Sequence, residues 1–171
     1  NYDIIVDPFS INPSTIPYNN PLNITYNYNN CKNCSFYKYN DKNKWKIIDS
    51  NVDNNSITAE INTSGTYALL KETNKPVISN LKPSLNSKYN SDDIKQIVFN
   101  IEDELSGINP YNVNISLNNS KLFYDYIPYR NLVLANIYQE LESGIQSLKI
   151  EISDNVGNKK SVIGEFIILD K

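Results

Sequence analysis

Residues 148–158 have the sequence LKIEISDNVGN, which combines the two patterns that indicate a β-fold. Its first half alternates apolar with charged or polar residues, which is the period of a β-strand with one buried face. Its second half supplies turn chemistry, because Asp154 can accept backbone N–H bonds while Gly157 and Asn158 tolerate the positive φ of a tight turn. The stretch therefore predicts a strand that turns and pairs with 160–169.

The same alternation extends outward along the chain in both directions. Asn, Asp, Ser and Gly separate the alternating segments and predict turns between them. The predicted strands are 22–28, 36–39, 44–48, 56–61 and 66–70, then 77–81, 94–101, 111–117, 121–127, 129–135, 146–153 and 160–169. Helix signals are limited to one or two turns near Leu134–Leu141, which we interpret as a loop.

Four prolines punctuate the opening of the chain, at positions 8, 13, 17 and 21. Proline cannot donate a ladder hydrogen bond. We therefore expect an extended edge or linker before Leu22, with Asp3–Val6 as a potential first strand.

Length and composition indicate folded β-domains. The chain has 171 residues, of which 40% are hydrophobic and 20% charged, as in soluble globular proteins. The pattern predicts an all-β chain of two tandem sandwiches, a small one at 1–75 and a second at 76–171, joined near Lys75 and Pro76. The predicted core residues are Ile24, Tyr26, Trp45, Ile57, Ile61 and Tyr67 in the first, and Ile97, Phe99, Ile101, Val113, Ile115, Leu148, Ile150, Ile152 and Phe166 in the second.

The composition also excludes several function classes. The chain contains no His, so it cannot build a Ser-His-Asp triad or an imidazole-ligated metal site. A net charge of -3 gives no general basic surface for nucleic acid, and no apolar run is long enough for membrane insertion. The absence of Met indicates a piece of a longer protein, whose other domains are expected partners.

Five motifs together resemble bacterial immunoglobulin-like and fibronectin type III-like modules: 65–69 (GTYAL), 76–78 (PVI), 103–108 (DELSGI), 141–144 (LESG) and 148–158. The resemblance covers most of 76–171. More loosely, residues 1–75 resemble the short β-module that precedes such a domain in the non-catalytic C-terminal regions of bacterial surface proteins, cell-wall peptidases and adhesins.

This resemblance implies tandem β-sandwiches in an extracellular or cell-surface location. It implies a non-catalytic spacer, adhesion or protein-contact module and carries over no catalytic residue. The alternative is a carbohydrate or cell-wall binding accessory module of a secreted enzyme, with a surface glycan as its partner.

Cys31 and Cys34 form a Cys-x-x-Cys motif in a predicted turn. Such a pair can be a redox centre, half of a zinc site or a short disulfide. A redox motif of the thioredoxin type needs a βαβ setting, and zinc needs two further ligands that this chain lacks. We predict a structural disulfide, which suits an exported protein.

Asp103 and Asp154 each end a predicted strand, and the two loops are expected at the same pole of the second sandwich. Hard carboxylate oxygens suit Ca²⁺, so these residues are candidates for a structural calcium site. Capping of the turns is sufficient to explain these residues without a metal and is the favoured interpretation. No other cofactor is predicted.

Tyr37, Tyr39 and Trp45 are candidates for a sugar-stacking surface in the first module. The alternative is a core role, because Trp45 shares a face with Ile47. Carboxylates at 102–104, Glu140 and Glu142 raise the question of glycoside hydrolysis, but no cleft is predicted around them, and we expect no enzymatic activity.

Overall fold

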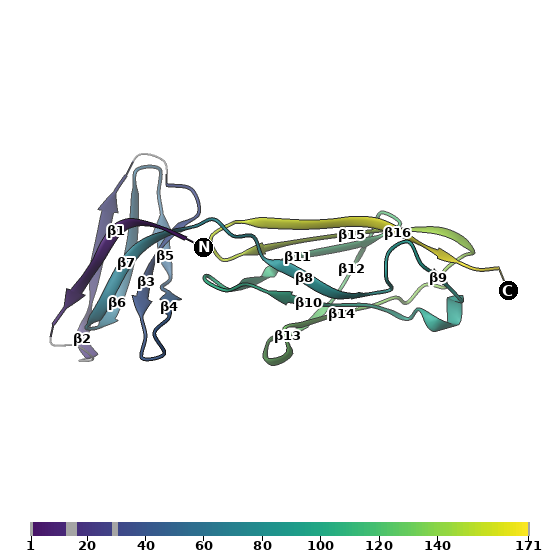
Figure 1. Ribbon diagram of the computed structural model, residues 1–171, viewed down its shortest axis with the longest axis horizontal. Coiled ribbons are helices and arrows are strands. Elements are labelled where there is room, and N and C mark those ends of the chain that lie inside the picture. Colours follow the sequence, from purple (N-terminus) through teal and green to yellow (C-terminus); the bar gives the residue numbers. More distant parts are fainter. Residues whose placement is uncertain (1, 13–16, 29–30, 171) are drawn as a thin grey trace. The chain divides into compact units, whose positions relative to one another are not determined.

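A computed structural model describes residues 2–12, 17–28 and 31–170 of the chain. It is all-β, as predicted, and divides into two compact units. Unit 1 comprises residues 1–74 with 156–158, and unit 2 comprises 75–155 with 159–171 (Figure 1). Within the described residues the helices are two 3₁₀ turns, η1 (Ser91–Asp93) and η2 (Pro128–Arg130). None of them has the length or apolarity to span a bilayer.

Unit 1 consists of two antiparallel sheets. One has the order β1 (Tyr2–Ile11), β7 (Gly65–Glu72), β3 (Cys34–Tyr39) and β4 (Trp45–Ile47), and the other β2 (Pro17–Asn27), β6 (Ser56–Thr63) and β5 (Ser50–Val52). Phe36 and Leu69 of the first sheet share one hydrophobic core with Ile57 and Ala59 of the second. The two sheets therefore form a small sandwich.

Of the two alternatives for the opening stretch, the extended edge is confirmed and the linker is wrong. Residues 2–11 form β1, which pairs with β7, and residues 17–27 form β2, which pairs with β6. Both strands lie at sheet edges, and the register shifts near Pro8 and again between Pro17 and Leu22. Edge positions and irregular pairing are where a strand tolerates proline, so these prolines restrict the strands without preventing them. Pro13 lies outside the described residues.

Unit 2 is a larger sandwich. One sheet has the order β13 (Asp125–Ile127), β14 (Leu132–Asn136), β10 (Gln96–Glu102) and β8 (Val77–Lys82), and the other β12 (Ser120–Leu122), β11 (Ile108–Leu117), β15 (Gly144–Asp154), β16 (Lys159–Ile168) and β9 (Lys88–Tyr89). Inward-facing side chains of both sheets form one continuous core. The predicted hairpin is present, since β15 pairs with β16 along ten residue pairs and Gly157 has φ +95°.

The predicted strand 121–127 is divided in the structure. Its first part is β12 in one sheet and its second part is β13 in the other, so Phe123 and Tyr124 carry the chain across the sandwich. Period-two alternation continues through such a crossing because each part still alternates, which is why the sequence did not reveal it.

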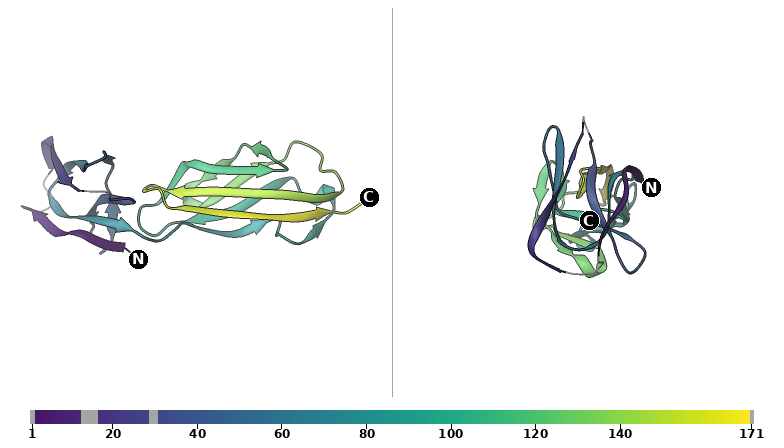
Figure 2. Two further views of the ribbon diagram at one scale, coloured as in Figure 1. Left: turned by 90° about the horizontal axis from the view of Figure 1, so that it is seen from above. Right: turned by 90° about the vertical axis from the view of Figure 1, so that its left-hand side faces the viewer.

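Unit 2 has two ends that are fixed by strand register. At the entry pole, Val77 pairs with Glu102, and Ile108 pairs with Asp154. At the exit pole, Gly144 pairs with Ile168. The chain enters unit 2 at one end and leaves it at the other, and Figure 2 shows β15 and β16 running along the whole sandwich between them.

Most predicted core residues are buried. All nine predicted for unit 2, together with Ile57, Ile61 and Tyr67 of unit 1, are at most 2% exposed. Ile24 and Tyr26 are half-buried. Ile24 and Tyr26 pack against the core of unit 1, whereas Trp45 lies half-buried on the edge strand β4 and is not among the described side chains that pack against that core, so the prediction was wrong for Trp45.

Candidate functional site

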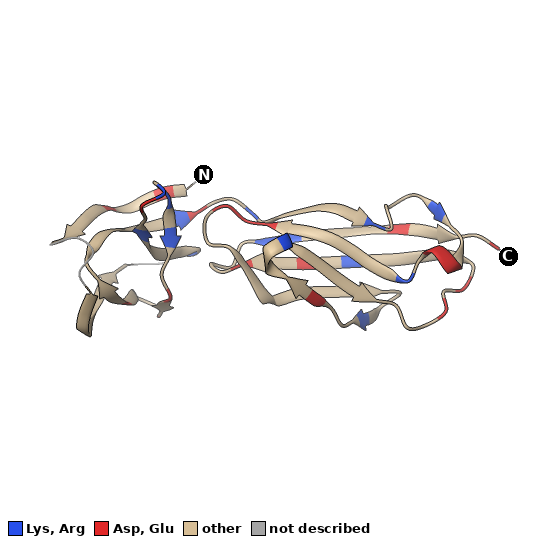
Figure 3. Cartoon of the chain, turned by 90° about the horizontal axis from the view of Figure 1, so that it is seen from below, with Lys and Arg blue, Asp and Glu red and all other residues tan. Residues whose placement is uncertain are grey.

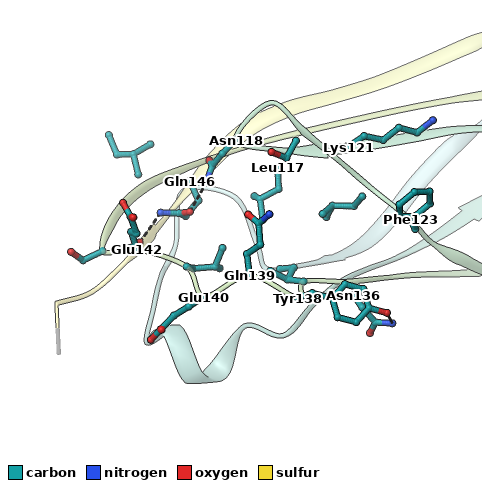
Figure 4. Close-up of a pocket in the computed structure, with 16 residues that line it drawn as sticks. Leu117, Asn118, Lys121, Phe123, Asn136, Tyr138, Gln139, Glu140, Glu142 and Gln146 are labelled. Atoms are coloured by element: carbon teal, nitrogen blue, oxygen red, sulfur yellow. Dashed lines mark hydrogen bonds between the residues drawn. The ribbon is translucent and has the colours of Figure 1, made fainter.

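A cavity of 460 Å³ opens near the exit pole of unit 2 (Figure 4). Its wall is formed by the end of β11, by β12 and Phe123, by the loop 137–143 after β14, and by the start of β15. This volume is in the range of small-ligand sites. These segments belong to three separate connections between strands, so the positions of the strands in the sandwich determine how the cavity is assembled.

The buried carboxamide of Gln146 holds these connections together. Its Nε2 donates to the carbonyl oxygens of Glu142 at 2.9 Å and Gly144 at 3.3 Å, and its Oε1 accepts from Asn118 Nδ2 at 2.7 Å. Asn118 in turn accepts from the Ser147 N–H at 2.8 Å through Oδ1. Both ends of both amides are therefore engaged, which fixes the turn after β11 against the loop before β15.

Two aromatic rings stand at the cavity. Phe123 is 83% exposed and Tyr138 is 86% exposed, although both line its wall. Asn136 Nδ2 lies 3.3 Å from the Tyr138 hydroxyl, and Asn136 Oδ1 accepts from Gln96 Nε2 at 2.7 Å. Gln96 thus holds the side chain of Asn136, which in turn orients the hydroxyl group of Tyr138.

The acidic pair Glu140 and Glu142 also lines this cavity. Our expectation that no cleft surrounds these residues was therefore wrong. The cavity is built by side chains and loops that are distant in sequence, and alternation within a strand carries no information about such loops.

Asp103 and Asp154 come together at the entry pole, with carboxylate oxygens within 4.8 Å of each other. Asp103 Oδ2 accepts from the Gly107 N–H at 2.7 Å and the Leu105 N–H at 3.3 Å, so it caps its own loop. Asn155 Nδ2 donates to the Ser106 carbonyl at 2.8 Å and ties the two loops together. The arrangement fits turn capping, and it also leaves calcium binding as a prediction.

The aromatic residues predicted for unit 1 do not share one surface. Tyr37 is fully buried, so its prediction as a stacking ring was wrong; it sits in the middle of its sheet between Ala68 and Ile47. Tyr39 and Trp45 pack edge to face with ring centroids 5.1 Å apart, and Trp45 Nε1 donates to the Tyr2 hydroxyl at 3.2 Å. Ligand binding by Tyr39 and Trp45 stays a prediction.

Cys31 and Cys34 form a disulfide with Cα atoms 5.7 Å apart. Cys34 is buried and belongs to the core of unit 1 together with Phe36. The bridge therefore joins the turn before β3 to the sandwich core, as a structural disulfide does.

Sequence reasoning missed the cavity, although one signal was present. The segment 137–143 is a loop of seven residues between two strands, longer than most connections in compact domains. Long ordered loops often carry binding sites, and this loop contains Tyr138 and Gln139 beside the two acids.

No protein-family model matches the sequence, and no curated protein was found with a similar sequence. Among solved structures, the chain is similar to CopC from Methylosinus trichosporium OB3b, with 14% identity and a TM-score of 0.45 over 54% of this chain and 92% of that one. It is also similar to the fibronectin(III)-like modules of CbhA from Clostridium thermocellum, with 11% identity and a TM-score of 0.37 over 94% and 93%. Both likenesses concern the fold alone.

Proposed function

We propose that the chain is a non-catalytic spacer and contact module of an exported or cell-surface protein. Each unit buries its own core, and four residues connect β7, which ends at Glu72, to β8, which begins at Val77. A connection that is short and contains Pro76 suits a tandem array better than a flexible tether.

The observation that carries the proposal is the placement of entry and exit in unit 2. The chain enters at Val77 on the entry pole and leaves at Ile168 on the exit pole. β15 runs between these poles, and its 11 residues span roughly 33 Å at the rise of an extended strand. A module of this kind adds its full length to the protein that contains it, which is what a spacer requires.

Two further features support an exported module. The Cys31–Cys34 disulfide is the kind of bond that persists in oxidising compartments. Lys and Arg are interspersed with Asp and Glu along the strands of both units (Figure 3), a mixed surface that suits a soluble module.

The spacer geometry is testable by electron spin resonance. Spin labels at Val77→Cys and Leu169→Cys, both at exposed positions of unit 2, should give a narrow distance distribution centred at roughly 30 to 40 Å. A double variant labelled at Val77 and Tyr111, also exposed, is a control that keeps one label fixed. A short or very broad Val77–Leu169 distribution would contradict the proposal.

The non-catalytic part of the proposal needs its own assay, because Glu140 and Glu142 line a cavity. Incubation with soluble polysaccharides should release no reducing ends above the level of buffer. Release that disappears in Glu142→Gln would show a glycoside hydrolase and would overturn this part of the proposal.

A further inference from the structure

The exit-pole cavity combines features that the spacer role does not require. Phe123 and Tyr138 expose more than four fifths of their surface, although large apolar side chains are normally more buried. Single exposed aromatics are common, but here two of them, from different connections, line one cavity. Stability of the sandwich does not explain this placement, because both rings lie outside the hydrophobic core.

The cavity is preorganised by hydrogen bonds. Gln146 is 4% exposed, and its carboxamide links the loop before β15 to Asn118, while Asn136 orients the hydroxyl of Tyr138. Loops held in this way do not have to be ordered when a ligand binds, which lowers the entropic cost of binding.

Polar groups with unused hydrogen-bonding capacity line the same space. The side chains of Gln139, Glu142 and Lys121 make no hydrogen bond or ion pair with any described residue, and all three line the cavity. In Figure 4 the side chain of Gln139 extends from its loop toward the strand that carries Leu117. Together they offer amide donors and acceptors, carboxylate acceptors and one ammonium donor.

This combination restricts the class of ligand. A purely apolar ligand would desolvate Gln139 and Glu142 without satisfying them, which is unfavourable. A polyanion would meet two carboxylates, Glu140 and Glu142, against one ammonium, Lys121. A pyranose ring has apolar C–H faces that can lie on an aromatic ring, and a rim of hydroxyls that each donate and accept hydrogen bonds.

We propose that this cavity is a binding site for an uncharged oligosaccharide. Tyr138 and Phe123 stack against sugar rings, and Gln139 and Glu142 bind hydroxyl groups. The site is in unit 2 and does not include Tyr39 and Trp45 of unit 1, which the sequence suggested, and it is independent of the spacer role.

The test is isothermal titration of the full chain with two probes, a β-1,4-linked glucose hexamer and a β-1,4-linked N-acetylglucosamine hexamer. At least one probe should bind saturably. Tyr138→Ala and Gln139→Ala should each weaken that binding by about tenfold or more, as truncation of a central contact does. The probe that binds shows whether the site takes a polymer of glucose or one of N-acetylglucosamine.

Tyr129→Ala is the matched control, because Tyr129 is a tyrosine of the same unit, 82% exposed, that does not line the cavity. It should leave affinity within about twofold, and all three variants should melt like the parent because the residues are exposed. Absence of binding to both probes would overturn the proposal. Binding that Tyr138→Ala leaves intact but Tyr39→Ala removes would also overturn it and place the site in unit 1.

Discussion

In this chain, asparagine occupies many of the positive-φ positions that glycine usually occupies in proteins. The chain has 29 Asn and only 5 Gly. Seven Asn residues in the described part of the chain have positive φ: Asn33, Asn43, Asn80, Asn86, Asn118, Asn119 and Asn131. Asn is the side-chain-bearing residue that most readily adopts this conformation. The compositional bias therefore has a structural use, at turns and, for Asn80, at the irregular pairing within β8.

Asn131 provides a direct test of this use. It ends η2 with φ 51°, and its backbone N–H bonds to the Pro128 carbonyl. Asn131→Ala should lower the free energy of unfolding by about 1 to 2 kcal/mol, because alanine is strained in this region. Asn131→Gly should change it little, and urea denaturation compares the two. Equal stability of the alanine and glycine variants would show that the backbone can relax at this turn.

Two isoleucines on the paired strands β15 and β16 of unit 2 differ in burial, so replacing them with alanine should cost different amounts of stability. Ile150 on β15 is fully buried, while Ile163 on β16 is 68% exposed. Ile150→Ala should cost about 2 to 5 kcal/mol through lost burial and a cavity. Ile163→Ala should cost about 0.5 kcal/mol or less. Similar losses in chemical denaturation would mean that the register of the hairpin is wrong.

Ionisation of the buried Tyr67 should make the stability of unit 1 decrease at high pH. Burial raises its pKa above the ordinary value of 10.0, partly opposed by the hydrogen bond to Thr63 and reinforced by Tyr18. The unfolded chain then loses this proton first, so the contribution to stability is complete below about pH 10 and falls as pH rises further. Denaturation followed by Trp45 fluorescence at pH 8 and pH 11 measures this loss of stability. Tyr67→Phe should reduce the difference in stability between the two pH values. A parent and variant with the same pH dependence would exclude Tyr67 as its source.

At the scale of elements, alternation was sufficient for most strands and for the core of unit 2. The buried faces of β10, β11 and β15 follow directly from it. Among the strands whose bounds the pattern did not give, β1 and β2 are longer than predicted because edge strands tolerate proline, and β12 and β13 alternate continuously across a change of sheet. Sheet membership depends on which strands pair, and a local pattern contains no such information.

The disulfide is expected to stabilise unit 1 modestly. Cys31 and Cys34 are separated by three positions, and closing so short a loop contributes about 2 kcal/mol in the chain-entropy model. Reduction should lower the melting temperature reported by Trp45, the single tryptophan of the chain, which lies in unit 1. The double variant Cys31→Ser/Cys34→Ser is the control and should be unaffected by reductant. An unchanged melting temperature for the reduced parent would show that the core alone fixes this turn.

Calcium remains a prediction for the loops at the entry pole. Two carboxylates within 4.8 Å, from Asp103 and Asp154, favour a shared cation. Calcium at 100 times its dissociation constant should raise the free energy of unfolding by about 2.7 kcal/mol, and chelator should reverse the gain. Asp103→Asn should abolish the response, whereas Asp92→Asn, at an exposed acid on η1, should preserve it. Equal melting in calcium and chelator would leave turn capping as the role of Asp103.

At the scale of the whole molecule, the chain consists of two β-sandwich units, and the second contains a preorganised cavity. Apart from the length of the loop 137–143, no sequence signal indicated the cavity, because Gln146, Asn118 and Tyr138 come together only when strands from both sheets are in place. Composition restricts the chemistry that any site in this chain can use, since the chain has no His for the commonest catalytic groups.

Sugar binding at the exit-pole cavity is located by titrating the ¹⁵N-labelled chain with the oligosaccharide that binds and following the amide chemical shifts. We predict that shifts concentrate in residues 117–123 and 136–146, around Tyr138 and Gln146, while the amides of Tyr39 and Trp45 stay unchanged. Shifts centred on Tyr39 and Trp45, or spread evenly over the chain, would contradict it.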